Sequence, residues 1–354
     1  MQRPTNPASS CADCGPASFT RRDFLRTTAG VASVAALGGV TLPRISLAAE
    51  AARPAATGAT SETLVGQLYH SLSEEQRKVL CFPFDHPLRS KVDNNWTIVD
   101  KHIGDALNKD QQDLVRQIFM GIHSPEYSQK VFDQVEHDGG GKGTFFEECA
   151  VALFGEPDKS GDAQKGKFEF VLTGRHCTRR CDGNSVAGAA FGGPIFYGHA
   201  AQSFNESATH PGNVYWYQAL RANEVFKALD GRQRKLALRT DARKEEGTKT
   251  VALAGKKGEL HGIPLTELSA DQKELVHLVM ADLLAPFRKA DADEAMKLIT
   301  AAGFDNLHMA FYRNMDIGQD GVWDVWQVEG PSMVWYFRGA PHVHTWVHVR
   351  EPSV

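Results

Sequence analysis

The stretch Pro341-His342-Val343-His344-Thr345-Trp346-Val347-His348-Val349 governs both the fold class and the candidate site of this chain. Alternate side chains of a β-strand point to opposite faces, so we expect its three histidines and Trp346 on one side and a valine-rich row on the other. The valine row predicts a surface that faces the core. The histidine row places His342 and His344 roughly 7 Å apart along the strand, a spacing from which both imidazoles can converge on one metal ion.

Other segments of the chain also have the composition of β-strands. Residues 306–313, 321–328 and 332–337 alternate and carry Trp, Tyr and Val, which is typical of strands joined by short turns. Residues 145–154 and 167–173 are rich in Phe and Val and are bounded by Gly and Pro. Together with the closing stretch, these segments predict a mainly antiparallel sheet.

One local motif occurs four times and predicts four amphipathic helices. Each copy places a Ser, Asn or Asp directly after a Leu and three residues ahead of a Gln, which is the sequence form of a capping box. The capping side chain accepts a hydrogen bond from a backbone N–H of the new helix, and the Gln reaches back to the cap. The four copies are Leu72-Ser73-Glu74-Glu75-Gln76, Leu107-Asn108-Lys109-Asp110-Gln111, Leu229-Asp230-Gly231-Arg232-Gln233 and Leu268-Ser269-Ala270-Asp271-Gln272.

These elements predict an α+β fold, with amphipathic helices packed on one face of a mainly antiparallel β-sheet. Two of the capping boxes lie early in the chain and two lie late, a pattern that predicts two related halves; chance recurrence of a common motif is the alternative. We expect a single domain over residues 61–354, preceded by an Ala/Pro/Thr-rich disordered spacer at 49–60.

The N-terminal segment 1–48 is predicted to be a twin-arginine signal peptide. Residues 20–26 (Thr-Arg-Arg-Asp-Phe-Leu-Arg) hold the arginine pair, residues 27–42 are mildly apolar and uncharged, and Ser46-Leu47-Ala48 form a small-residue cleavage site. The apolar run is too short and too rich in Ala and Gly for a membrane span, although an uncleaved anchor is the alternative. We therefore expect the twin-arginine export machinery as a partner, a periplasmic or extracellular location, and no stable membrane span in the mature protein.

Composition and net charge further narrow the class of protein to which this chain can belong. The 354-residue chain is 42% hydrophobic and 23% charged, an ordinary composition for a globular protein. Of its 39 basic and 43 acidic side chains, the leader holds five Arg and two Asp, so the mature chain keeps 34 and 41, a net charge of about −7. This balance predicts no nucleic-acid partner.

The mature chain keeps four cysteines. Because export would place them in an oxidising compartment, we expect them to form disulfides. Cys177 and Cys181 are four residues apart and are the first expectation for a bridge across a turn. Pairing of these two with Cys81 and Cys149 stays open, since four cysteines allow three connectivities.

A third metal ligand is expected where a strand over residues 168–173 ends in a glycine and delivers His176. If this strand lies near the closing one, His176, His342 and His344 form a three-His set. Such a set suits one divalent metal (Zn, Cu or Fe) and leaves a position open for water or substrate. His199 and His348 are reserve ligands. The alternative is that all of them are surface histidines, or core histidines with satisfied hydrogen bonds.

Several stretches, taken in order, resemble the bacterial and fungal proteins catalogued as domain of unknown function 3500. They are residues 71–77, 82–89, 154–157, 170–176, 196–198, 219–234 and 342–346. The family tends to have Gly-His-His where this chain has Gly174-Arg175-His176, so the second His of that motif is retained, as are both histidines of the closing motif. The resemblance covers nearly all of the mature chain and implies the same three-His set, but it supplies no reaction.

The favoured function is an exported metal-dependent enzyme that acts on a small molecule. Arg175 would hold an anionic or carbonyl-bearing substrate beside the metal, and Trp346 would also contact the substrate. The rival function is a non-catalytic periplasmic protein that binds a sugar or another small ligand on an aromatic sheet face. A structural protein with incidental histidines is the third interpretation.

Replacing Arg21 and Arg22 together by Lys should leave the precursor in the cytoplasm, because the arginine pair defines the twin-arginine signal. Fractionation of cells that produce the full chain measures where the protein accumulates. Normal export of the double-lysine variant would refute the assignment.

Overall fold

The computed structural model describes residues 59–162, 164–199, 214–314, 321–340 and 342–352. The expected leader at 1–48 and most of the expected spacer at 49–60 lie outside these residues. Thr60 is described, and its side chain accepts a hydrogen bond from the backbone N–H of Thr63. This cap starts the first described helix at Ser61, where we expect the domain to begin.

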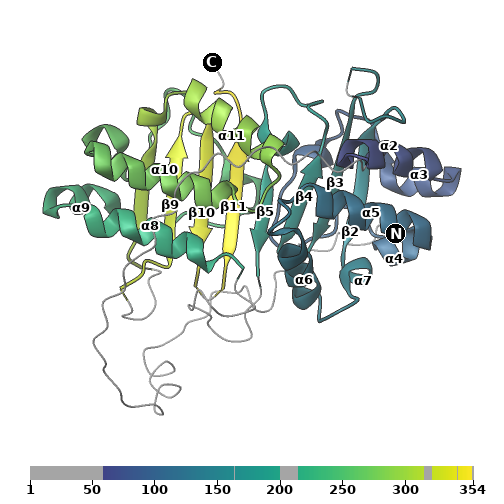
Figure 1. The fold of residues 1–354 in the computed structure, drawn as a ribbon, viewed down its shortest axis with the longest axis horizontal. Helices are drawn as coiled ribbons and strands as arrows, with labels where there is room; N and C mark the ends of the chain where they lie inside the picture. Colours follow the sequence, from purple (N-terminus) through teal and green to yellow (C-terminus); the bar gives the residue numbers. More distant parts are fainter. Residues whose placement is uncertain (1–58, 163, 200–213, 315–320, 341, 353–354) are drawn as a thin grey trace, which may run out of the picture. The chain divides into compact units, whose positions relative to one another are not determined.

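Eleven strands form one sheet in the described chain (Figure 1). They are β1 (Cys81–Phe82), β2 (Ala150–Gly155), β3 (Phe168–Gly174), β4 (Cys177–Cys181), β5 (Ile195–Gly198), β6 (Leu238–Arg239), β7 (Ile263–Pro264), β8 (His308–Tyr312), β9 (Val325–Gly330), β10 (Met333–Arg338) and β11 (His344–Val349). Their spatial order is β1-β2-β3-β4-β5-β11-β10-β9-β8-β6, with β7 beside β8. The pairs β1–β2 and β6–β8 are parallel, and the other pairs of this sheet are antiparallel.

Ten α-helices accompany the sheet within the same residues. They are α2 (Ser61–Ser71), α3 (Glu74–Leu80), α4 (Ile103–Ala106), α5 (Lys109–Gly121), α6 (Ser128–Asp138), α7 (Phe145–Glu148), α8 (Trp216–Ala228), α9 (Gly231–Ala237), α10 (Ala270–Leu284) and α11 (Lys289–Ala301). Single 3₁₀ turns add η1 (Pro87–Ser90), η2 (Ala190–Gly192), η3 (Gly247–Val251), η4 (Leu265–Glu267) and η5 (Phe304–Asn306). No helix among the described residues has both the length and the apolar content that a membrane span requires.

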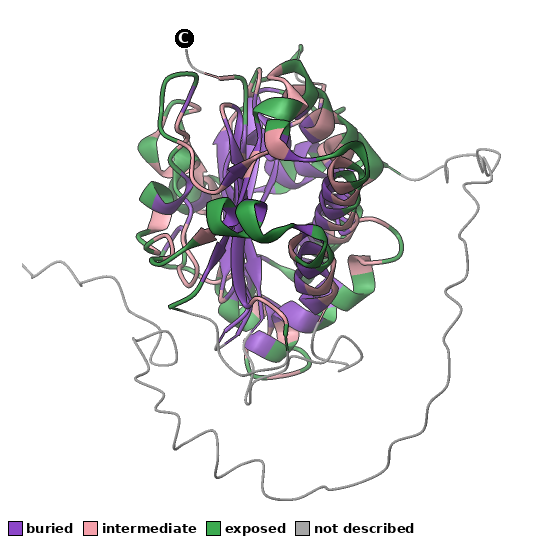
Figure 2. Ribbon diagram, turned by 90° about the vertical axis from the view of Figure 1, so that its left-hand side faces the viewer, coloured by how far each residue is buried: buried purple, intermediate pink, exposed green. Residues whose placement is uncertain are grey.

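The longer helices lie against one face of the sheet, as α2, α5, α8, α10 and α11 show in Figure 1. Figure 2 shows the buried strands from the side, between these helices and the loops and short helices of the other face. The larger core cluster includes Val343, Val347 and Val349. A smaller cluster includes Phe196 and Trp346. The predicted α+β fold is confirmed.

The closing stretch of the chain is buried on both of its faces. The regular strand begins at His344, and His342 lies just before it. Its valine row packs in the larger core, as predicted. The opposite row is covered as well, since Trp346 is 1% exposed and packs against Phe196 with 4.7 Å between ring centroids. A strand that is buried on both faces has a nearly continuous apolar sequence, which the histidines interrupt here.

The two halves of the chain repeat one order of elements. In each half, two helices (α2 and α3, or α8 and α9) precede a short parallel edge strand, β1 or β6. Two further helices of at least 11 residues follow (α5 and α6, or α10 and α11), and then four strands run from the sheet edge toward its centre (β2 to β5, or β8 to β11). The halves meet where β5 pairs with β11.

All four predicted capping boxes are present, and they are linked in pairs. In the first half, Gln76 and Gln111 exchange side-chain hydrogen bonds of 2.7 and 3.1 Å. In the second half, Gln233 and Gln272 exchange bonds of 2.9 and 2.8 Å. Each glutamine also donates to a backbone carbonyl at a matching place in its half, namely those of Ala106, Ser71, Glu267 and Ala228. The repetition thus extends to single hydrogen bonds, while a common origin of the halves stays a prediction.

The predicted Cys177–Cys181 bridge is wrong. Both residues lie on β4, where residues four apart are separated by roughly 13 Å, whereas a disulfide needs Cα atoms within about 7 Å. The strand runs through all five residues, so no turn brings the two thiols together. Cys81 and Cys149 are free as well, so the predicted oxidation of the four cysteines is also wrong. Burial raises the pKa of the Cys177 thiol to about 11, which keeps it protonated at neutral pH.

Gln111→Ala should lower the free energy of unfolding by about 2 kcal/mol, because it removes a partner from the part-buried amide of Gln76 and from the carbonyl of Ser71. Urea unfolding followed by circular dichroism measures the change. Gln117→Ala is the matched control on α5, since Gln117 is exposed and contacts Asp113 at the surface. The control should cost less than about 0.5 kcal/mol. Equal losses in the two variants would contradict a stabilising role for the glutamine pair.

Candidate metal centre

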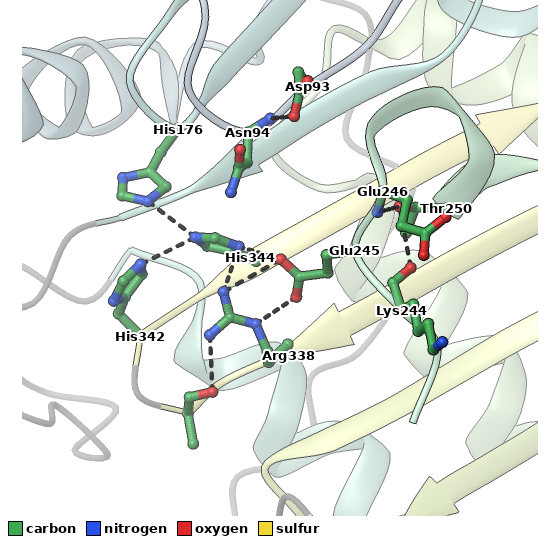
Figure 3. Close-up of polar contacts among 11 residues, drawn as sticks. Asp93, Asn94, His176, Lys244, Glu245, Glu246, Thr250, Arg338, His342 and His344 are labelled. Carbon is green, nitrogen blue, oxygen red and sulfur yellow. Dashed lines mark hydrogen bonds and ion pairs between the residues drawn. The ribbon is translucent and has the colours of Figure 1, made fainter. Parts of the chain in front are cut away.

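Three histidines from distant parts of the chain converge on one point (Figure 3). His176 lies in the turn between β3 and β4, His342 precedes β11, and His344 is the first residue of β11. The Nε2 atom of His344 is 3.0 Å from the Nε2 of His176 and 3.0 Å from the Nε2 of His342. One nitrogen from each ring lies within 4.8 Å of the others. The three residues are 2%, 4% and 0% exposed, so the predicted three-His set is both assembled and enclosed.

The turn that carries His176 has an unfavourable backbone conformation. The φ angle of His176 is +52°, in the left-handed region that non-glycine residues rarely adopt, at a cost of order 1 kcal/mol. Its N–H donates to the carbonyl of Asn94 at 2.8 Å, which anchors the turn. Two residues earlier, a Cβ at Gly174 would meet the Sγ of Cys149 at 2.8 Å. Close packing and one hydrogen bond therefore fix the direction of the imidazole.

Asp138 holds the ring of His176. It is the last residue of α6, and its Oδ2 is 2.9 Å from Nδ1 of His176. Gln134, one helical turn earlier, donates from Nε2 to Oδ1 of Asp138 at 2.8 Å. Both oxygens of Asp138 are thus engaged, and the imidazole is oriented with Nε2 toward the other two rings.

Glu245 holds the ring of His344 in the same way. Its Oε2 is 2.6 Å from Nδ1 of His344, and Arg338 of β10 forms an ion pair with the same carboxylate and also contacts that Nδ1. The segment that carries Glu245 is fixed by Thr250, whose Oγ1 accepts from the N–H of Glu246 at 2.7 Å (Figure 3). Two carboxylates from different halves of the chain therefore direct two of the three rings.

The Asp138 carboxylate assigns the proton on one of the rings. A ring nitrogen and a carboxylate oxygen 2.9 Å apart need a proton between them, so Nδ1 of His176 carries the proton and its Nε2 is an acceptor. Nδ1 of His344 contacts both the Glu245 carboxylate, which accepts, and the Arg338 guanidinium, which donates, so its neighbours do not assign one tautomer. When Nδ1 of His344 carries the proton, a cation between the two Nε2 atoms satisfies both.

Burial keeps these imidazoles neutral. Burial and the nearby Arg338 guanidinium lower the pKa of His344 to about 3, although Glu245 opposes the shift. Burial also holds the pKa of His342 far below its usual value, and His344 and His176 add to the effect. Burial works against ionisation of Glu245, but Arg338 and His344 outweigh it and hold the pKa of that carboxyl well below its usual range. Neutral imidazoles backed by ionised carboxylates are the forms that bind metal.

The separations between the rings fit a small transition-metal ion. Two nitrogens about 2.1 Å from a tetrahedral ion lie roughly 3.4 Å apart, close to the 3.0 Å between neighbouring Nε2 atoms of this cluster. Metal-binding histidines commonly donate their second ring N–H to a carboxylate, as His176 does to Asp138. Three nitrogens suit Zn, Cu or Fe better than Ca or Mg, which prefer oxygen ligands.

The two residues predicted to bind substrate lie at different depths beside the cluster. Arg175 directly precedes His176, is half-buried, and forms an isolated backbone bridge with Asn95. Trp346 lies two residues beyond His344 on β11, so the two side chains share a face of the sheet. Its ring is packed within the core of that face, and only its indole N–H has no hydrogen-bond partner among the described residues.

The two reserve histidines do not join the three-His set. His348 turns its Nδ1 to the carbonyl of Val251, at 3.1 Å. His199 follows β5 and is 1% exposed, but it lies outside the group of ring nitrogens that share one point.

Three charged residues around the histidines were not predicted from the sequence, namely Asp138, Glu245 and Arg338. Asp138 ends α6 directly before the glycines at 139–141. In the sequence it therefore has the character of an ordinary polar residue at a helix terminus. Glu245 lies in the charged stretch 239–258, which predicts a loop. No periodic pattern marks these residues, because their role depends on which side chains are buried beside them.

The family comparison agrees with the resemblance noted in the sequence. A family model described as a protein of unknown function, DUF3500, matches residues 55–353. The chain belongs to this family. The DUF3500 match spans the three histidines and all three of the charged residues that surround them. No curated protein and no solved structure matches the chain significantly.

Proposed function

We propose that this DUF3500 protein is a metal-dependent enzyme that acts on a small molecule, with one divalent ion held by His176, His342 and His344. The observation that carries the proposal is the convergence of three buried imidazoles from distant segments, with Nε2 of His344 3.0 Å from Nε2 of His176 and 3.0 Å from Nε2 of His342. Burial disfavours the protonated form of His342 and His344, so these rings are in the neutral form that binds metal. A metal ion at this point contacts one nitrogen of each ring.

An enzyme fits this donor set better than a structural metal site. Three protein nitrogens leave a tetrahedral ion one position for water or substrate, as in catalytic zinc sites, whereas structural sites use four protein ligands. The set suits Zn, Cu or Fe. When bound, such an ion supplies Lewis acidity or an activated water. Arg175, which directly precedes His176 in the chain, is proposed to bind the substrate.

The rival function, non-catalytic binding of a sugar or another small ligand, has less support. It requires aromatic rings exposed on one face of the sheet, where a sugar can stack. Trp326, Trp335 and Trp346 are at most 1% exposed and contribute to the core instead. Among the described residues, these rings offer no stacking surface.

We further propose that the twin-arginine machinery exports the protein to the periplasm or out of the cell. The arginine pair at 21–22 and the small-residue site Ser46-Leu47-Ala48 support this proposal. The route carries folded proteins, which suits a metal centre built from residues far apart in the chain.

Protein purified without a histidine tag and stripped of metal should bind about one equivalent of Zn²⁺ or Co²⁺. His342→Ala should weaken this binding about 100-fold, because the two remaining histidines hold the ion poorly. Isothermal titration calorimetry measures the affinity, and the ion should also raise the melting temperature of the wild type by mass action.

His348→Ala is the matched control for this experiment. His348 lies on the same strand as His344 but faces the carbonyl of Val251, so its loss should leave metal affinity as in the wild type. Equal binding by His342→Ala and His348→Ala, or no binding by the wild type, would contradict the proposed metal site.

Asp138→Asn should weaken metal affinity by about 10- to 100-fold, because a neutral amide no longer increases the basicity of the His176 ring. Asp133→Asn makes the same change on the exposed side of α6, where Asp133 accepts from Gln129, and should have no effect. Competition with a coloured chelator compares the three proteins. An unchanged affinity in Asp138→Asn would exclude a role for this carboxylate in the metal site.

A further inference from the structure

The loop that carries Glu245 presents two side chains of opposite charge to the sheet. This loop, residues 240–251, follows β6 and ends with η3. Arg243 and Glu245 are half-buried, whereas the residues on either side of Glu245 are exposed. Figure 3 shows Glu245 directed at the ring of His344, in agreement with the 2.6 Å between its Oε2 and Nδ1 of that ring. The role of Arg243, two residues earlier, follows from its contacts.

Arg243 fixes this loop to β9 through a buried ion pair. Its Nη2 is 2.7 Å from Oε1 of Glu329, and its Nε donates to Oε1 of Gln327 at 3.3 Å. Glu329 and Gln327 are 2% and 0% exposed, and the amide of Gln327 donates to Oε2 of Glu329 at 2.7 Å. Within the described chain, Glu329 has Arg243 as its ion-pair partner. The loop is thus tied to a charge that is buried in the sheet.

The same guanidinium joins the two ends of the loop. Nη1 of Arg243 donates to the carbonyl of Thr250 at 3.1 Å. The hydroxyl of Thr250 donates to the carbonyl of Lys244 at 3.3 Å and accepts from the N–H of Glu246 at 2.7 Å. Lys244 and Glu246 are the neighbours of Glu245 in the chain. These bonds therefore fix the backbone on both sides of Glu245.

Glu245 depends on a fixed loop because its carboxylate has partners on two different strands. It forms an ion pair with Arg338 of β10 and contacts Nδ1 of His344 on β11 at 2.6 Å. Two polar atoms about 3.6 Å apart are no longer hydrogen-bonded. A loop displacement of about 1 Å would therefore release the ring of His344.

We propose that Arg243 is a positioning residue for the three-His centre: it holds Glu245 in place, and through Glu245 it orients His344 for metal binding. The inference rests on the proposed function and extends it to a residue that is bonded to β9 and to its own loop. Because Arg243 acts through another residue, its loss should weaken and distort the metal site without removing a ligand.

Removing the ion pair as a unit tests this inference. Loss of Arg243 alone would leave the Glu329 carboxylate buried and unpaired, which is strongly destabilising, whereas replacing both partners by apolar side chains is often neutral. Arg243→Met with Glu329→Leu should bind Co²⁺ about tenfold more weakly than the wild type, in the range of changes made behind a metal ligand. The visible absorption of the bound Co²⁺ should also change, because the His344 ring is no longer held in one orientation.

Arg221→Met with Asp282→Leu is the matched control. Arg221 and Asp282 form an ion pair of 2.8 Å between α8 and α10, in the helix layer. This control should keep the Co²⁺ affinity and the absorption spectrum of the wild type. Equal weakening by the two double variants would assign the effect to general destabilisation and overturn the inference.

Combination with Glu245→Gln shows whether Arg243 acts through Glu245. Glu245→Gln alone should weaken Co²⁺ binding about 10- to 100-fold. The triple variant should bind Co²⁺ no more weakly than Glu245→Gln, because the loop then has no carboxylate to position. Losses of affinity that add would overturn the inference, as would wild-type affinity in the folded Arg243→Met, Glu329→Leu variant.

Glu329→Gln keeps the test valid if the double variant does not fold. It retains the shape of the side chain but removes the charge that holds Arg243, so it should weaken Co²⁺ binding about threefold. Wild-type affinity in Glu329→Gln would then overturn the inference. A wild-type protein that binds no Co²⁺ would instead refute the proposed function itself, and the role of Arg243 with it.

Discussion

The antiparallel pairing of β5 with β11 is the contact on which the rest of the structure depends. Within the sheet, it is where the two halves of the chain meet. Gly198 stands opposite His344 in this ladder, and a Cβ at Gly198 would lie 2.0 Å from the carbonyl oxygen of Val343. Glycine is therefore required where the two strands approach each other beside the histidines.

This pairing also sets the distance between the ligands. Because β4 pairs with β5 and β5 pairs with β11, the β3–β4 turn and the start of β11 lie two strand spacings apart, roughly 10 Å. The rings of His176 and His344 extend from the two sides and bring their Nε2 atoms to 3.0 Å. A shift of β11 by one residue would turn His344 to the opposite face of the sheet and separate the rings. The strand register, more than any local motif, determines the candidate centre.

The features that could be predicted from sequence are those that a few consecutive residues determine. A capping box such as Ser73 to Gln76 specifies a helix start by itself, and the alternation that ends at Val349 indicates both the strand and its core-facing side. A spacing of four between Cys177 and Cys181 fits a turn or a strand equally well, so the disulfide prediction failed. The carboxylates that orient the histidines come from a helix end and a loop, and only tertiary packing brings them to the rings.

The wide separation of the histidines along the chain has a consequence for the order of events in the cell. His176 and His344 are 168 residues apart. A ribosome that adds 5–20 residues per second needs roughly 10 to 30 s to synthesise this interval. During most of that time His176 is the only one of the three histidines that has been synthesised, and a single imidazole does not retain an ion. Under the proposed function, metal capture follows the synthesis of β11, and a loaded centre marks a chain whose two halves have already joined.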